Sequence, residues 1–402
     1  MNTRTHIIDA ISHSNNRSEL RLDPGRVYSA SLRLGNLGVS GVNGKLYNAL
    51  GGVYSLIKNI YLMNNSDILD QLYEAHNFLA FSTSVSNENA NNFSLWSHLN
   101  GNNNSYSIGH DHDEGDFVKE NKVVVLPVLK NSLTLNGLLN LKRCFNLLSQ
   151  FPDDMLDTSV FPNIHIVIEW RDRNEWASCF QGDTTGALAT MNVLQPQLFA
   201  DEVLNPPKMP EKYSLQFLTV ELDRVYANGG VNGTVVQTKQ RCNNFTDKYI
   251  ERLLLINMKP NTLSSNSVDD AVKCDGSTAF KNEVINVVAD GHSVLDFPYC
   301  NSDARKMGLL TDCFGDVCVP LSSNKYVEDI TNKDDLYRDQ AKNLVGKMSF
   351  FGCFVRNKVS ELLVNHERLC TALENSAFWL YVLGQVGKQL VVNGNSYSMG
   401  YI

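Results

Sequence analysis

Short stretches in which apolar and polar residues alternate recur along the chain, with turn-forming residues between them. Residues 164–170 give the clearest case, because β-branched residues alternate there directly after Pro162 and Asn163. The same pattern, in weaker form, predicts strands at residues 26–34, 53–63, 68–72, 123–129, 213–226, 284–289, 292–295, 360–364, 378–382, 389–392 and 395–398. Many short strands at such spacing are typical of β-sandwiches.

Three other stretches have patterns that leave room for helix. Apolar residues at 138, 139, 141, 145, 147 and 148 are spaced as in a short helix, and the mixed charges at 333–346 also allow one. Residues 249–258 fit either a strand or a short helix. Asn is frequent beside Gly, Asn or Ser, and both Asn and Gly tolerate the positive φ of tight turns. We therefore expect a mainly β protein with short helices in its loops.

Two predicted hairpins resemble each other at a distance of 226 residues. Residues 57–70 and 283–296 both consist of an apolar strand, a two-residue turn of Asn, Asp or Gly, and a short strand that ends in Leu-Asp. Asp290-Gly291 is a strong hairpin turn. Only the final two residues are identical, and hairpins recur in any β protein. If the repeat is real, each half of the chain is one sandwich of about eight strands in two sheets.

Length and composition fit this picture and narrow the function. The 402 residues correspond to about two or three domains, and 43% hydrophobic with 19% charged residues is enough to build a core. The net charge is 35 − 43 = −8, so no general attraction to nucleic acid is expected. No apolar run approaches the ~18 residues of a membrane span, and the first residues lack the apolar region of a signal peptide. We expect synthesis and folding in the cytosol or nucleus.

The nine cysteines indicate reduced, mostly buried thiols, since their number is odd and their spacings are scattered. The alternative is a metal site around Cys313 and Cys318. That pair has no second CxxC and no nearby His pair, so the sequence does not support the four ligands of a structural zinc site.

Residues 83–122 are polar, rich in Asn and Ser, and long for a loop within a compact domain, which favours a functional role. They contain the densest set of possible metal ligands, His110-Asp111-His112-Asp113-Glu114. The flanking Asn, Ser and Gly residues indicate a solvated loop tip rather than a metal site. Trp96 lies in the same loop, where a core role is harder to assign and a contact between subunits is plausible.

No catalytic constellation emerges from the chain. It has no G-x-S-x-G, P-loop, HExxH or GxGxxG motif, and Gly229, Gly230 and Gly233 do not precede a helix. The pairs Asp153-Asp154 and Asp269-Asp270 are typical of turns or caps. The charges of residues 169–173 end a strong strand, and we expect them to pair across strands or across a subunit contact. We expect no catalytic, cofactor-binding or metal-binding residues and no cofactor.

The order and spacing of these elements resemble the double jelly-roll major capsid proteins of icosahedral double-stranded DNA viruses, from virophages, polinton-like viruses and nucleocytoplasmic large DNA viruses. Three segments carry the likeness over most of the chain. They are residues 52–62 with their Asn-rich turn, residues 124–127 followed by a Leu-rich stretch and the strand at 161–170, and residues 213–226, which would close the first half.

The resemblance implies two tandem eight-stranded jelly rolls, with an N-terminal arm at residues 1–25, a first jelly roll at 26–235 that carries the loop 83–122 as an outer tower, and a second at 236–402. It implies a homotrimer that forms a pseudo-hexagonal tile of an icosahedral capsid, in contact with neighbouring capsomers and with minor capsid or penton proteins. The expected place is the virion, after synthesis in the host cytoplasm or nucleus. Neither enzymatic activity nor sequence-specific nucleic-acid binding is expected.

Two other readings remain open at this point. The chain could be a tandem β-sandwich that binds a receptor or a carbohydrate through loop 83–122. It could also be a hydrolase on a β scaffold, which would need a base and a nucleophile within hydrogen-bond reach. A three-fold, hexagon-outlined particle would separate the capsid subunit from both.

Overall fold

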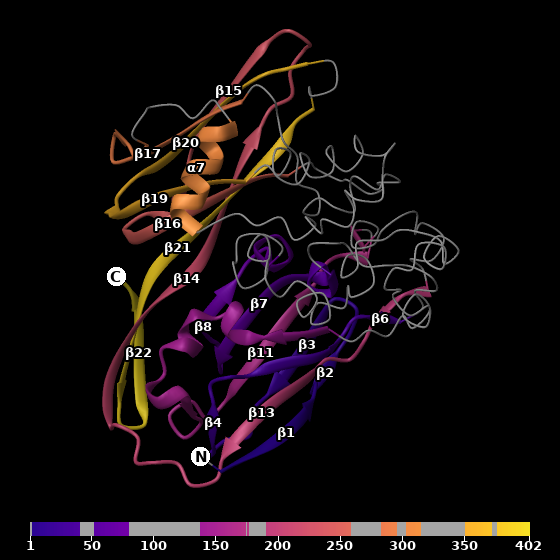
Figure 1. Ribbon diagram of the computed structural model, residues 1–402, viewed down its shortest axis with the longest axis vertical. Helices are drawn as coiled ribbons and strands as arrows, with labels where there is room; N and C mark the ends of the chain where they lie inside the picture. Colours follow the sequence, from indigo (N-terminus) through magenta and orange to yellow (C-terminus); the bar gives the residue numbers. More distant parts are fainter. Residues whose placement is uncertain are drawn as a thin grey trace, which may run out of the picture.

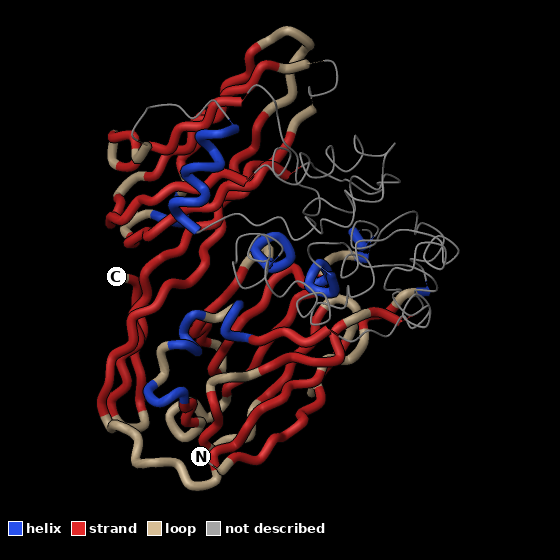
Figure 2. Tube along the Cα trace, viewed as in Figure 1, coloured by secondary structure: helices blue, strands red, loops and turns tan. Residues whose placement is uncertain are grey.

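The computed structural model describes residues 2–40, 52–79, 137–173, 175–176, 190–258, 283–295, 303–314, 350–371 and 376–402. Strands make up most of these residues, and they form two sandwiches that follow one another along the long axis of the molecule (Figures 1 and 2). Residues of the N-terminal half form the lower sandwich in this view, and residues of the C-terminal half form the upper one.

The first sandwich packs two antiparallel sheets face to face. In one sheet β13 pairs with β1 on one side and with β4 and β5 on the other, and these two pair in turn with β10 and β9. This sheet contains β1 (Thr3–Asp9), β13 (Gln197–Val203), β4 (Val27–Ser29), β5 (Arg33–Leu37), β9 (Gly137–Asn140) and β10 (Met155–Asp157). The second has the order β2 (Ser12–His13), β3 (Arg17–Arg21), β11 (Ile164–Trp170), β7 (Ile57–Asn64) and β8 (Asp67–Leu72). A small ladder joins β6 (Val39–Ser40) to β12 (Asn192–Val193).

The second sandwich is built in the same way. One sheet has the order β14 (Lys212–Ala227), β21 (Phe378–Asn393), β16 (Lys248–Met258) and β19 (Phe350–Val359), and β22 (Ser396–Tyr401) pairs with the far end of β21. The other has the order β15 (Val235–Arg241), β20 (Leu362–Leu369), β17 (Glu283–Ala289) and β18 (His292–Ser293). Helix α7 (Asp303–Phe314) packs against β19.

Both halves share one strand order. With β4 and β5 taken as one interrupted strand, β9 and β10 as another, and the two-residue strands β2, β6 and β12 left out, the strands of the first half can be numbered one to eight along the chain, as can β14 to β21 in the second half. The sheets of both halves then run 1-8-3-6 and 2-7-4-5. That is the order of a jelly roll, in which two Greek keys close a sandwich. The predicted fold, two tandem eight-stranded jelly rolls, is confirmed.

The two hairpins that resemble each other in sequence occupy the same position in this order. The β7–β8 and β17–β18 hairpins are strands four and five of their halves, and β7 pairs with β11 as β17 pairs with β20. Asp290 and Gly291 have φ of 48° and 82°, as a type I′ turn requires, and Asn65 has φ of 54°. The internal repeat predicted from the sequence is therefore matched by the topology.

Two details of the predicted division need correction. Residues 1–25, expected to form an N-terminal arm, instead supply strand one as β1 and strand two as β3. The strand at 212–227, expected to close the first half, pairs along its whole length with β21 and opens the second half. We therefore propose that the two jelly rolls meet between Val203 and Lys212 rather than at residue 235. The loop 83–122 lies outside the described residues.

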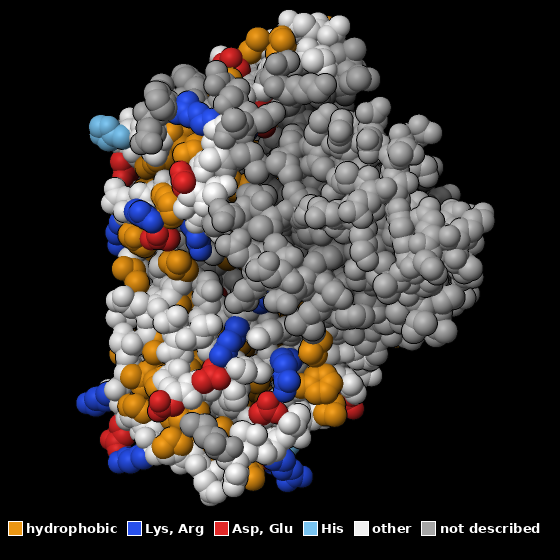
Figure 3. Space-filling model, viewed as in Figure 1, with side chains coloured by type: hydrophobic (Ala, Val, Ile, Leu, Met, Phe, Trp, Pro, Cys, Tyr) orange, Lys and Arg blue, Asp and Glu red, His pale blue; other side chains and the backbone are white. Residues whose placement is uncertain are grey.

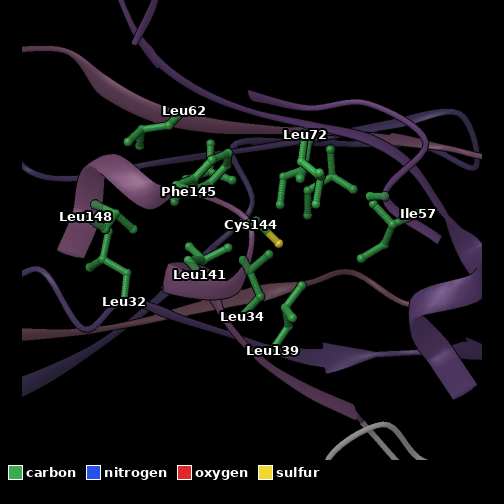
Figure 4. Packing of buried hydrophobic residues seen from close by; sticks show 14 of the residues in the cluster. Leu32, Leu34, Ile57, Leu62, Leu72, Leu139, Leu141, Cys144, Phe145 and Leu148 are labelled. Carbon is green, nitrogen blue, oxygen red and sulfur yellow. The ribbon is translucent and has the colours of Figure 1, made fainter. Parts of the chain in front are cut away.

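The predicted helix at 138–148 is also different in the structure. Strand β9 ends at Asn140, whose side chain accepts a hydrogen bond from the Lys142 backbone N–H and starts a 3-10 turn, η2 (Leu141–Arg143). Two further turns follow, η3 (Asn146–Ser149) and η4 (Pro152–Asp154), before β10. Strand six is thus interrupted by an insertion, residues 141–154. Its Leu141, Cys144, Phe145 and Leu148 fill the first core (Figure 4).

Candidate functional site

The junction between the jelly rolls combines apolar packing with polar side chains buried between the two halves. Strands β14 and β21 are each 16 residues long, and together with β22 they continue past the second sandwich along the side of the first (Figure 1). Buried side chains from their lower parts belong to the same hydrophobic cluster as the first core; they are Leu215, Phe217, Val220, Leu390 and Val392. The two cores are therefore joined rather than merely adjacent.

A buried carboxylate of β14 is in contact with residues of three other strands at this junction. Glu221 of β14 accepts a hydrogen bond from Gln71 Nε2 of β8 at 3.0 Å and another from the Tyr401 hydroxyl of β22. Lys248 of β16 lies 3.7 Å from the same carboxylate and 4.0 Å from the centre of the Tyr401 ring. Since each partner comes from a different strand, the arrangement fixes the first sandwich against the sheet of the second.

Asp70 lies next to this group and is fully buried. Its two carboxylate oxygens accept the backbone N–H of Gln71 at 2.8 Å and of Leu147 at 3.0 Å. Burial raises the pKa of Asp70 to about 6, in spite of these hydrogen bonds and the charge of Lys388. Burial also lowers the pKa of Lys388. These two groups hold the β7–β8 hairpin, the insertion and β21 in one place.

A second ion pair crosses the junction farther along β14. Arg224 donates to Glu74 at 2.9 Å, and its guanidinium lies 5.0 Å from the centre of the Tyr381 ring on β21. Burial raises the pKa of Glu74, although Arg224 opposes the shift. The neighbouring His76 is also buried, and burial together with the charge of Arg171 holds its pKa well below the ordinary range. His76 is therefore a neutral packing residue near neutral pH.

A tyrosine of β22 forms hydrogen bonds at the end of the junction nearest the β7–β8 turn. The Tyr397 hydroxyl donates to Asp67 at 2.7 Å and accepts from Asn64 Nδ2 at 3.0 Å, and both partners flank the β7–β8 turn. Its ring lies 5.2 Å from that of Phe161. The C-terminal strand β22 is therefore hydrogen-bonded to both strands of the β7–β8 hairpin in the first jelly roll.

Two open clefts flank the junction. One has a volume of about 480 Å³ and is lined by Asn59, Tyr73, Glu221, Leu222, Asp223, Arg224 and Asn244. The other, about 460 Å³, lies between the β7–β8 turn and β22. The acidic groups of the first are already engaged, Glu221 by Lys248 and Asp223 by the backbone N–H groups of Arg224 and Asn244. Within the described ranges no three His, Cys, Asp or Glu side chains are grouped so as to hold a metal ion.

A polar cluster closes the far end of the second sandwich. Glu283 of β17 accepts hydrogen bonds from Asn257 Nδ2 at 2.8 Å and Lys306 Nζ at 2.7 Å, and its Oε2 lies 3.0 Å from His366 Nε2. Burial alone would raise the pKa of Glu283, but the His366 hydrogen bond and the Lys306 charge outweigh it and hold the pKa at about 2. Both sheets and α7 meet at this one carboxylate.

The sequence-predicted candidates fall into three groups. Charges at 169–173 pair within the chain: Glu169 accepts from Asn59 and Tyr61 across the β11–β7 ladder, and Arg171 contacts Glu175. Glu169 therefore bonds across strands to two neutral side chains, whereas Arg171 pairs with a carboxylate four residues farther along the chain. Asp153 and Asp154 have positive φ in a turn, as predicted. The cluster at 110–114, Trp96 and Asp269-Asp270 lie outside the described residues.

The cysteines in the described part of the chain have buried thiols. These are Cys144, Cys242, Cys313, Cys353 and Cys370. Burial raises the pKa of Cys242 to about 12 and that of Cys313 to about 11. Both thiols are therefore protonated near neutral pH, as packing residues are. Cys318, the proposed partner of Cys313, lies outside the described residues.

The sequence did not predict the polar contacts of the junction or of the Glu283 cluster. The available signal was a single charged or amide residue within an apolar strand, such as Glu221 between Val220 and Leu222 or Asn257 after Ile256. Such residues need partners when buried. Their partners lie 23 to 180 residues away, so the sequence pattern alone does not identify them.

Known proteins match this chain in structure but not in sequence. No protein-family model matches the chain, and no curated protein matches it in sequence. Among the described residues no helix is long and apolar enough to span a membrane.

Solved structures of viral capsids, in contrast, are similar over nearly the whole chain. PBCV-1 Vp54, fitted into a cryo-EM reconstruction of the virophage Sputnik, matches with 9% identity and a TM-score of 0.56, over 100% of this chain and 97% of its own. A chain of the Sputnik virophage structure matches with 10% identity and a TM-score of 0.57, over 100% and 88%. The mavirus major capsid protein matches with 6% identity and a TM-score of 0.54, over 99% and 90%. The chain has the double jelly-roll fold of these proteins.

Proposed function

We propose that this protein is a major capsid protein that assembles as pseudo-hexagonal homotrimers into an icosahedral viral shell. The observation that supports it best is the repeated strand order of the two halves, joined by a junction with a continuous core. Three copies of a chain with two equivalent units place six similar units around one axis, which is the outline of a hexagonal tile. The fold shared with the virophage and mavirus proteins supports the same role.

The proposal gives the chain a structural role in the virion, with neighbouring capsomers and minor capsid or penton proteins as partners, after synthesis in the host cytoplasm or nucleus. Charges of both signs are interspersed with apolar side chains on the described part of the face in Figure 3. Such a mixed surface suits a protein packed on several sides by other subunits. An obligate trimer interface of this kind buries ~2,000–5,000 Å².

The oligomeric state of the purified protein tests the proposal. Sedimentation velocity at micromolar concentration is expected to give one species of three times the chain mass, and averaged electron micrographs are expected to show a three-fold particle with a hexagonal outline. The trimer should persist on dilution until the chain unfolds. A folded monomer at micromolar concentration would count decisively against a capsid subunit.

Deletion of residues 83–122 separates this role from that of a binding module. A capsid subunit is expected to keep its trimers and its unfolding temperature without the loop, whereas a receptor- or carbohydrate-binding module would lose its ligand. A glycan array probed with the full chain and the deleted chain gives the readout. Ligand binding that disappears with the loop, in a protein that forms no trimers, would favour the binding module.

A further inference from the structure

The edge strands β14 and β1 differ in whether the backbone groups on their outer side have hydrogen-bond partners. In β14 the even-numbered residues point their N–H and C=O groups away from β21, since the Gly394 N–H bonds to the Glu211 carbonyl and thereby fixes the alternation. Side-chain amides occupy this edge: Asn146 donates to the Leu218 carbonyl at 2.6 Å and Asn244 to the Leu222 carbonyl at 2.7 Å.

Gln240 extends the same protection. Its Nε2 donates to the Arg224 carbonyl at 3.0 Å, and its Oε1 accepts from the Tyr226 N–H at 3.3 Å. The edge of β14 between Leu218 and Tyr226 is thus closed to another strand, by a means that natural sheets use against unwanted pairing.

Strand β1 is the opposite case. It forms the outer margin of the first sandwich, beyond β13 (Figure 1). The Leu204 N–H bonds to the Asn2 carbonyl, so the residues whose backbone groups face outward are Thr3, Thr5, Ile7 and Asp9. Within the described residues, no backbone or side-chain group bonds to this outer edge.

Polar side chains of β1 bond to residues of the neighbouring strand β13, and none of them bonds to the outer backbone groups of β1. Thr5 donates to Asp201, His6 contacts Glu202 at 2.7 Å, and Asp9 accepts from Gln197 at 2.9 Å. These contacts hold β1 firmly in the sheet while its outer N–H and C=O groups stay open. An ordered strand of this kind is a template for one further strand.

Exposed apolar side chains accompany this edge. Ile7, at the centre of the strand, is 60% exposed, Ile11 just beyond it is 61% exposed, and Leu204 at its start is 51% exposed. A strand added to β1 would cover Ile7 directly. Backbone pairing and apolar burial therefore point to the same partner geometry.

We infer that β1 pairs antiparallel with β1 of a second copy of this chain, and so joins two capsomers; this rests on the proposed function. In the register centred on His6 all four outward residues find outward partners, with Thr3 opposite Asp9 and Thr5 opposite Ile7. In this register Arg4 lies opposite Ile8 and Asp9 opposite Thr3, so neither residue faces a like charge, whereas in-register parallel pairing would set Arg4 beside Arg4 and Asp9 beside Asp9.

The symmetry of this contact places it between trimers. Antiparallel pairing of identical strands is isologous and has a two-fold axis, and a three-fold trimer contains none. The contact therefore belongs to the association of one trimer with the next.

Sedimentation of trimers over a concentration series tests the inference, with Ile7→Lys as the variant and Val231→Lys as its control. Val231 is 72% exposed and lies in the turn before β15, far from β1 in sequence and in the other sandwich. Ile7→Lys is expected to keep the trimer and weaken trimer–trimer association by about ten- to hundred-fold, the effect of losing the burial of one isoleucine. The control is expected to associate as the wild type does.

Thr5→Pro gives the same test through the backbone, because the Thr5 N–H points outward and proline there leaves the β1–β13 ladder intact. Cross-linking gives an independent readout. With Thr5→Cys and Ile7→Cys in one chain, mild oxidation is expected to give disulfide-linked dimers, and Val231→Cys is not.

The outcomes separate the two proposals. Trimers that associate equally well with Ile7→Lys and Thr5→Pro, or wild-type trimers that never associate, overturn the β1 contact and leave the capsid subunit in place. A chain that forms no trimer at all overturns the proposed function itself.

Discussion

At the scale of single residues, the most consequential groups are polar side chains buried where elements meet. Glu283 joins β17, β20, β16 and α7 through one carboxylate, and Glu221 joins β14, β8, β22 and β16. A buried charge of this kind favours the native arrangement over others, because any arrangement that separates it from its partner leaves an unpaired charge in the interior. These residues specify how the elements fit more than they add to the stability of each element.

The variant Glu283→Gln tests this for the second sandwich. The glutamine leaves Lys306 without a counter-charge in a buried site, and the loss is expected to be about 3–5 kcal/mol of unfolding free energy at pH 7. Because the pKa of Glu283 is lowered from 4.5 to about 2, its stabilising contribution is present above about pH 4.5 and is lost as the pH falls toward 2.

Urea unfolding of both proteins at pH 7 and at pH 3 measures this prediction. The difference between wild type and variant is expected to shrink at the lower pH. Glu251→Gln is the matched control, since its partner Arg356 is exposed and the pair lies 3.2 Å apart at the surface; a loss below about 1 kcal/mol is expected there. Equal losses for the two variants would contradict the role given to Glu283.

At the scale of elements, the sequence predicted those strands and hairpins that depend only on the local pattern of residues. Strand β11 and the hairpins β7–β8 and β17–β18 follow from alternation and turn residues alone. Strand β1 was missed because Thr3–Asp9 is an edge strand with little buried surface, so its sequence carries only Ile7 and Ile8 as apolar residues. The place of β14 was misassigned because its partner β21 lies more than 150 residues farther along the chain.

The amide side chains along β14 yield a prediction for this element. The double variant Gln240→Ala/Asn244→Ala exposes the carbonyls of Leu222 and Arg224 and the N–H of Tyr226. We expect a loss of about 0.5–1.5 kcal/mol for each hydrogen bond, and faster aggregation because the edge is open to other strands.

Turbidity and thioflavin fluorescence during incubation below the unfolding temperature measure the aggregation. The control is Gln237→Ala/Asn243→Ala, which changes the same residue types on the same elements without touching the β14 edge. Aggregation rates that do not differ between the two double variants would show that the amides do not protect the edge.

At the scale of the whole molecule, the two jelly rolls are expected to unfold together. The lower parts of β14 and β21 belong to the first core and their upper parts to the second, so neither core is complete without this strand pair. Two independent sandwiches of this size would give two transitions, but a shared strand pair couples them.

Phe217→Ala tests the coupling. Phe217 lies on β14 and packs in the first cluster, and its truncation is expected to cost about 3–5 kcal/mol. Scanning calorimetry is expected to show one transition in both proteins, shifted to lower temperature in the variant. Val391→Ala on the exposed side of β21 should shift it little. A variant whose transition splits into two would show that the halves are independent.

The β14–β21 ladder also has a mechanical consequence. Its sixteen register pairs run without interruption along the flank of both sandwiches. A force that pulls the two halves apart along the long axis acts parallel to these strands, and because both strands are continuous through both halves it is carried by two covalent backbones held in register by the ladder. A force across the strands would break the bonds one after another. Beside β21 the third strand is β22 at the lower end and β16 above it, so the ladder is flanked along its length. The molecule is therefore stiffest along the direction in which its two halves follow each other.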